Sequence, residues 1–179
     1  MISLQLTPLA RARVWFGAPE LGFVPSGAVR RAVEGAPANV VAAERVALEV
    51  YVPRGGRAEY GLLGMCFRRH GTDLVQVEVP YTDGAGAPWP DALAARVDDV
   101  RLGLPSEYAM PVLDAIAEVG ARRVPPGTLR VAEAAHGLVG SSAAFFRQLA
   151  VGAVGLLLDD RGREESNLVT FLRGIFISP

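Results

Sequence analysis

The spacing of apolar residues changes along the chain, and this change constrains the fold more than any other feature. From Glu44 to Val79, three stretches alternate apolar and polar residues, which is the pattern of half-buried strands. Residues 105–119 place apolar side chains at helical spacing, 128–134 form another strand, and 143–158 form a long helix. The sequence therefore predicts an α+β domain with the order three strands, helix, strand, helix.

The two ends are patterned more loosely. We expect a short strand at 14–16, and a short helix over 28–33 that Ser26 caps. The Gly- and Pro-rich stretch 83–90 is predicted to be a surface excursion. The chain then divides into an N-terminal extension packed on the core (1–40), the core domain (41–160) and a C-terminal extension (161–179). The C-terminal extension contains a last strand candidate, 169–177.

Composition narrows the class of protein. The chain has 179 residues, of which 50% are hydrophobic and 21% are charged, which suits one domain with a sizeable core. The longest apolar run, 143–158, is broken by Arg147 and is too short for a membrane span, and no signal peptide is recognisable at the N-terminus. A net charge of −1 gives no global attraction to nucleic acid or anionic membrane. We therefore expect a cytoplasmic protein with no membrane or DNA partner.

All 18 basic residues are arginine, so the chain has no lysine. A P-loop, a Schiff-base enzyme and a protein kinase each require a lysine at a defined position, and none of these can operate here. One cysteine, Cys66, excludes an internal disulfide and a cysteine-based zinc site, and its apolar neighbours predict a buried thiol. The only histidines, His70 and His136, lie in separate predicted loops. The sequence predicts no metal site, no cofactor and no catalytic residue.

Two segments are candidates for binding. Arg54, Gly55, Gly56 and Arg57 form a turn that could meet phosphates through backbone and guanidinium donors, or form a plain hairpin with solvated arginines. His136 precedes Ser141 and Ser142 in a predicted strand-to-helix loop, where it could donate to a phosphate, act as a base or lie passively at the surface. The two serines are expected to cap the helix that follows.

Three segments, read in order, resemble the fourth domain of elongation factor G, the ribosomal translocase. Residues 55–61 resemble its Gly-Gly-Arg-Gly-Gln-Tyr-Gly turn, with Ala58 in place of one glycine. Residues 104–108 resemble the Val-Pro-Lys-Glu-Tyr start of its first helix. His136 with the serine pair, a phenylalanine and Ala150 resembles its His-x-x-Asp-Ser-Ser-x-x-x-Phe-x-x-Ala segment, with Gly140 at the Asp position. The resemblance covers about residues 44–160.

The resemblance implies a two-layer fold with a left-handed βαβ crossover, shared with a small-subunit ribosomal protein and with GHMP kinases. In that family the glycine turn and the histidine loop meet at the domain tip, which enters the decoding centre and touches the tRNA–mRNA duplex. The implied tip here contains Gly55, Gly56, Arg57 and His136, to which the flanking Arg54 and the Ser141–Ser142 pair are added as candidate contacts. The implied function is that of a stand-alone, non-enzymatic translation module, without the GTPase, that binds the ribosome, rRNA or structured RNA.

Two other functions stay open. Residues 137–144 resemble the Gly-Leu-Gly-Ser-Ser-Ala-Ala phosphate loop of GHMP kinases with Val139 inserted, which would make the chain a nucleotide- or phosphometabolite-binding protein. The scaffold could instead serve protein–protein contact, including a homodimer, because a fold does not fix a function. Ligand, oligomeric state and pathway are left undecided by these patterns.

Overall fold

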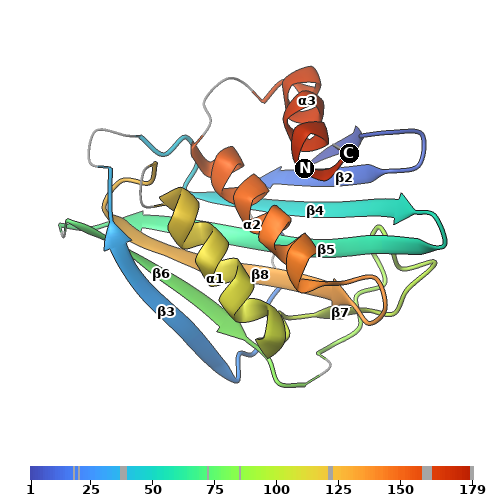
Figure 1. The fold of residues 1–179 in the computed structure, drawn as a ribbon, viewed down its shortest axis with the longest axis horizontal. Helices are drawn as coiled ribbons and strands as arrows, with labels where there is room; N and C mark the ends of the chain where they lie inside the picture. The colour runs from blue at the N-terminus through green and yellow to red at the C-terminus, as the bar shows by residue number, and fades with distance from the viewer. Residues whose placement is uncertain are drawn as a thin grey trace.

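The computed structural model of the chain describes residues 1–17, 19, 21–36, 40–71, 73–84, 86–120, 123–158 and 163–177. Within these residues it forms an α+β domain with one sheet of eight strands and three helices (Figure 1), which confirms the predicted fold class. The elements are β1 (Ile2–Gln5), β2 (Arg11–Phe16), β3 (Gly27–Glu34), β4 (Arg45–Arg54), β5 (Arg57–Arg69), β6 (Leu74–Tyr81), β7 (Val100–Leu102), α1 (Ser106–Gly120), β8 (Gly127–Gly137), α2 (Ala143–Leu158) and α3 (Glu165–Phe176).

The sheet has the strand order β1-β2-β4-β5-β8-β6-β3, and the short β7 pairs with β8 beyond this path. Strand β8 lies between β5, with which it is antiparallel, and β6, with which it is parallel. Helix α1 therefore belongs to a crossover from β6 to β8, as parallel pairing requires a connection across the sheet. The succession β4, β5, β6, α1, β8, α2 has the predicted order, with β7 as an addition.

Helices α1 and α2 cover one face of the sheet (Figure 1). Alternation along β4 directs Val46, Leu48 and Val50 to this face, where each is fully buried. Helix α2 contributes Phe145, Phe146 and Leu149 to the same core, and α1 contributes residues at helical spacing. This layer is the larger hydrophobic core, and its burial supplies most of the driving force for folding.

The opposite face is covered by residues 86–99, here called the covering segment. Its Ala92 and Ala94 pack against Tyr60 and Leu62, which alternation directs away from the helices. Trp89 also packs on this second cluster, and its backbone N–H donates to the carbonyl of Val100 at 2.9 Å. The stretch predicted as a surface excursion is exposed at residues 83–84, 86–88 and 90, and Trp89 within it is partly buried; Ala85 lies outside the described residues.

Glu49 fastens the covering segment to the sheet. This fully buried carboxylate accepts hydrogen bonds from the Tyr60 hydroxyl at 3.0 Å and from the Leu93 N–H at 2.7 Å. It also pairs with Arg13 at 3.3 Å, and Arg13 donates to the carbonyl of Asp91 at 2.8 Å. Burial raises the pKa of Glu49, against the opposing effect of these partners. These hydrogen bonds and the ion pair, here called the clamp, hold the covering segment on the sheet where the segment has no regular secondary structure.

Of the three elements predicted for the ends, the helix at 28–33 and the strand at 169–177 need correction. Residues 28–33 lie in strand β3, not in a helix, because Val29 and Val33 face the core while eight residues pair with β6. Residues 169–177 were predicted as a strand, but they belong mostly to helix α3, in which Leu168, Leu172 and Phe176 recur every four residues and are buried. The predicted strand at 14–16 is part of β2.

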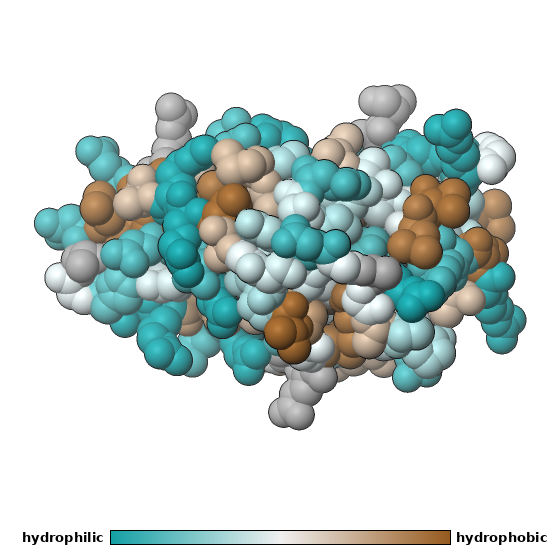
Figure 2. Space-filling model, turned by 90° about the horizontal axis from the view of Figure 1, so that it is seen from below, coloured by the Kyte–Doolittle hydropathy of each residue, from teal (hydrophilic) through white to brown (hydrophobic). Residues whose placement is uncertain are grey.

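The N-terminal extension continues the sheet at both edges, whereas the C-terminal extension adds helix α3. Strands β1 and β2 extend it beyond β4, and β3 extends it beyond β6. In Figure 2, which views the molecule from below, hydrophobic residues form small groups separated by hydrophilic ones. None of the helices in the described ranges combines the length and the apolar content that a membrane crossing needs.

Candidate functional site

The glycine turn joins β4 to β5 as a two-residue hairpin loop, with Arg54 opposite Arg57 in the register. Gly55 has φ 60°, a conformation that two-residue hairpin loops use and that glycine adopts without strain. Arg54 pairs with Glu59 and donates to the carbonyl of Phe176 at 2.9 Å. The Arg54 guanidinium therefore holds the end of α3. Within the described residues, Arg57, the other flanking arginine, forms no ion pair of this kind.

Residues 137–142, here called the α2 loop, are fastened to the start of β5. The carbonyl of Gly140 accepts from the Tyr60 N–H at 2.8 Å, and the Ser141 hydroxyl donates to the Tyr60 carbonyl at 2.7 Å. The same hydroxyl accepts from the Gly137 N–H at 2.9 Å. The Ser142 hydroxyl accepts from the Phe145 N–H at 3.2 Å, so Ser142 caps α2 as predicted, while Ser141 anchors the loop.

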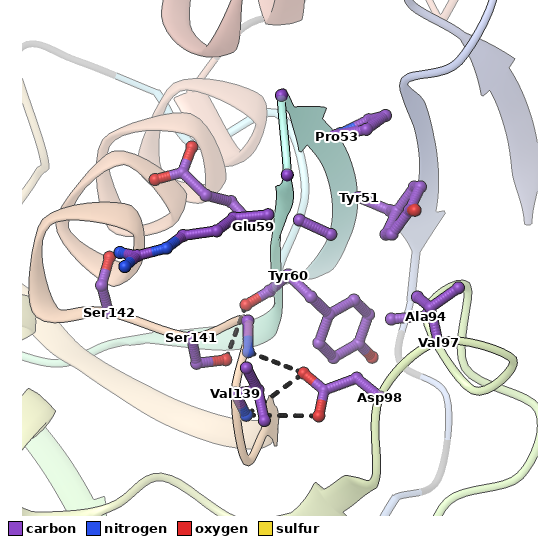
Figure 3. A pocket seen from close by; sticks show the side chains of 15 residues that line it. Tyr51, Pro53, Glu59, Tyr60, Ala94, Val97, Asp98, Val139, Ser141 and Ser142 are labelled. Atoms are coloured by element: carbon purple, nitrogen blue, oxygen red, sulfur yellow. Dashed lines mark hydrogen bonds between the residues drawn. The ribbon is translucent and has the colours of Figure 1, made fainter.

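Asp98 of the covering segment accepts hydrogen bonds from backbone N–H groups of the α2 loop. Its carboxylate accepts from the Gly140 N–H at 2.7 Å and from the Val139 N–H at 3.2 Å (Figure 3). A Cβ at Gly137 or Gly140 would lie 2.1 or 2.9 Å from Oδ2 of Asp98, so both glycines are needed to seat it. No local pattern around Asp98 predicts these contacts, and the paired glycines of the loop are the only sign of a close neighbour in the sequence.

These contacts bring the glycine turn and the α2 loop together around one pocket of about 500 Å³. It is bounded by residues 51, 53, 55–60, 94, 97–98 and 139–142, and is here called the tip pocket. Of the predicted contact residues, Gly55, Gly56, Arg57, Ser141 and Ser142 line it, and Arg54 and His136 do not. In Figure 3 Asp98 reaches across from the covering segment to the loop, and Tyr51 and Pro53 lie along the hairpin.

His136 lies in strand β8, and the prediction of a loop histidine is wrong. Only 5% of its surface is exposed, and its Nδ1 is 3.0 Å from the carbonyl oxygen of Gly103. Because a carbonyl oxygen can only accept, Nδ1 carries the proton and Nε2 presents its lone pair in the neutral ring. Strand β8 continues one residue past His136, which its short alternating pattern did not reveal.

Burial is the main influence on His136 and lowers its pKa. The hydrogen bond to Gly103 and the charges of Glu107 and Asp98 act in the opposite direction, while Arg101 acts with burial. Glu133, three residues away in sequence, does not face the ring, because it pairs with Arg45 at 3.0 Å. The imidazole is therefore neutral at pH 7.

His136 lines a second pocket, to which Gly137 and Leu138 of the α2 loop also contribute. This pocket has a volume of about 240 Å³, is bounded by residues 82–84, 105–108 and 136–138, and is here called the histidine pocket. The start of helix α1 forms one wall of it. The structure thus separates the glycine turn from His136, which the resemblance had placed in one site.

The remaining chemically distinctive residues lie apart from both pockets. Nε2 of His70 is 2.6 Å from the Thr128 hydroxyl. Cys66 was predicted to be buried but is only partly so, and burial raises the pKa of its thiol. In the described ranges, no three His, Cys, Asp or Glu side chains are grouped so that they could hold a metal ion.

Comparisons with protein-family models, curated proteins and solved structures found no match for this chain.

Proposed function

We propose that this chain is a non-catalytic binding module with the fold of the fourth domain of elongation factor G, and that a protein partner docks on its tip pocket. The observation that carries the proposal is the convergence of the glycine turn and the α2 loop around one open pocket. Three separate parts of the chain, within 51–60, 94–98 and 139–142, meet there, so the pocket is specified by the fold and not by one local segment.

The order of elements supports this fold. Two antiparallel strands, a third strand, a crossover helix, a parallel strand and a second helix succeed one another from β4 to α2. Both helices lie on one face of the sheet, as a two-layer arrangement requires (Figure 1). The left-handed crossover that the resemblance implies is part of the proposal.

The charges around the tip pocket favour a partner with a carboxylate. Its lining contains three charged residues, namely Arg57, Glu59 and Asp98. Glu59 pairs with Arg54, and Asp98 accepts from the loop amides. Among the described residues, none forms an ion pair with Arg57, so its guanidinium is the charge that remains for a partner.

Apolar side chains at the rim favour a protein over RNA. Val139 is 88% exposed and Val97 is 64% exposed, and both line the tip pocket with Tyr51 and Pro53. Exposed aliphatic groups next to an aromatic ring and one arginine are typical of protein interfaces. RNA binding instead rests on many cationic contacts to phosphates, and the lining offers one.

Photo-crosslinking tests the proposal. A photoreactive residue replaces Val139 in one variant and Val24 in a matched control, since these side chains are 88% and 89% exposed but only Val139 lines the tip pocket. In extracts of the native cells we expect a discrete protein adduct from position 139 only, and self-association would give an adduct of twice the chain's mass. Equal adducts from both positions, or none from either, would overturn the proposal.

Ribosome or RNA binding is the second candidate, because the Gly55–Gly56 turn and Arg57 offer donors at the tip. Co-sedimentation with 70S ribosomes over a salt series tests it, and Arg57→Ala should reduce the salt slope by about 1 if Arg57 contacts a phosphate. A nuclease-sensitive adduct from position 139 would also favour this candidate over a protein partner.

Nucleotide binding by the α2 loop has less support. A phosphate at this loop would need the N–H groups of Val139 and Gly140, and both already donate to Asp98. A bound phosphate would have to displace a carboxylate that two glycines are shaped to accept.

A further inference from the structure

We propose that the histidine pocket binds a small primary ammonium compound. This site is separate from the tip pocket, and the inference does not depend on the function proposed above. It is carried by the acceptor nitrogen of the buried His136 ring, by two carboxylates at the pocket wall and by the size of the pocket.

The first observation is the buried ring of His136. With Nδ1 committed to the carbonyl of Gly103, Nε2 is the ring atom left to meet an occupant of the pocket that His136 lines. A neutral imidazole with its proton on Nδ1 can only accept at Nε2. The occupant therefore has to bring an N–H or O–H donor to this atom.

The second observation is the charge of the wall. Asp83 and Glu107 both line the pocket, and no arginine does. Within the described residues, neither carboxylate takes part in an ion pair, whereas at the tip pocket Glu59 pairs with Arg54 and Asp98 accepts from the loop amides. Two exposed carboxylates and one imidazole acceptor favour a donor that also carries positive charge, which is an ammonium group.

The third observation is the volume. About 240 Å³ is below the usual range for drug-sized ligands, which begins near 300 Å³. The Thr82, Ser106 and Tyr108 side chains complete the wall and give a short polar tail further partners. A primary amine of a few heavy atoms with a hydroxyl group fits both the size and the chemistry.

The chain offers a direct spectroscopic test because it has only two histidines. The imidazole nitrogens of His136 and His70 are followed by ¹H–¹⁵N NMR at neutral pH, and His70→Gln assigns the two sets of signals. Ethanolamine is the probe, while tetramethylammonium supplies charge without an N–H, and acetate supplies an anion. A ligand this small binds in the millimolar range at best, so the titration extends beyond it.

We expect ethanolamine to shift the Nε2 signal of His136 saturably and to leave His70 unchanged. Glu107→Gln should weaken this binding about tenfold, because it removes one negative charge from the pocket wall. Glu107 is exposed, so the substitution breaks no buried contact. Glu165→Gln, an exposed carboxylate on α3, is the matched control and should bind as the unmodified chain does.

Four results would overturn the inference. Three are the absence of a saturable shift at His136, an equal shift with tetramethylammonium, and unchanged affinity in Glu107→Gln. A shift with acetate alone would show that the start of α1 binds anions, and would overturn it as well.

Discussion

The tip pocket and the histidine pocket are lined by successive parts of the α2 loop, and they differ in which polar groups the fold has already used. At the tip pocket the acidic groups are engaged, Glu59 by Arg54 and Asp98 by the loop amides, and the cation Arg57 remains. At the histidine pocket the acceptors remain, while the ring donor is engaged by Gly103. The comparison teaches that internal hydrogen bonds, more than net composition, decide which charge a pocket presents.

The largest expected effect concerns the clamp at Glu49, which holds the covering segment that lines the tip pocket. Glu49→Ala leaves the Tyr60 hydroxyl and the Leu93 N–H without their buried acceptor. We expect a loss of about 3 kcal/mol in the free energy of unfolding, measured by urea denaturation. Glu165→Ala on the surface of α3 serves as the control. A loss below about 1 kcal/mol would show that the covering segment holds its place without the clamp.

A double-mutant cycle sharpens the comparison at the α2 loop itself. Gly137→Ala would place a Cβ 2.1 Å from Asp98 Oδ2 and should cost about 2 kcal/mol of stability. In an Asp98→Ala background the same change should cost far less, which gives a coupling energy of about 1–2 kcal/mol. Additive effects of the two changes in thermal or urea unfolding would mean that Asp98 does not sit against these glycines.

The glycine turn gives a smaller effect with an internal control. Gly55 and Gly56 both have open space where a Cβ would lie, but only Gly55 has a positive φ. Gly55→Ala should therefore destabilise the chain by about 1 kcal/mol through backbone strain. Gly56→Ala should change the unfolding midpoint little, and equal losses would contradict the turn geometry described here.

The smallest effect is the pH dependence that His136 contributes. Its folded-state pKa is lowered, so the unfolded chain binds this proton more readily than the folded chain does. The stability it provides is present above its ordinary pKa near 6.5 and is lost as the pH falls toward the folded value. Urea denaturation at several pH values should show this loss. His136→Gln should lack it, and Glu49 and Glu133, whose raised pKa values act with the opposite sign, remain in that variant.

The sequence was sufficient for the helix-covered layer because its alternation and helical spacing are regular. Strands β4, β5 and β6 with α1, β8 and α2 lie where Val46, Leu48, Val112 and Ile116 indicate. It failed for residues 28–33, where Val29 and Val33 fit a helix and a strand equally, and pairing with β6 decides. At 169–177 the many apolar residues obscured the four-residue repeat of a helix. That helix packs near β1, and no local sequence pattern predicts this contact.

The site was predictable only in part, for a related reason. The glycine turn and the Ser142 cap are local features, and both were found from the sequence. The contacts of Glu49 with Leu93 and of Asp98 with Gly140 join residues more than forty positions apart. Such contacts leave no spacing pattern, and only paired glycines hint at them. The position of His136 was missed because strand β8 continues past it and buries its ring, away from the glycine turn.

The position of β8 in the sheet has a consequence for how the chain can be made. Residues 127–137 fill the gap between β5 and β6, two strands that were synthesised earlier and remain apart until then. A nascent chain that stops short of this segment carries two bare strand edges, which are sites for pairing with other chains. Long-range closure of this kind is slow. Productive folding therefore waits until residues 127–137 have been synthesised, and truncation before residue 127 yields an aggregation-prone fragment instead of a smaller domain.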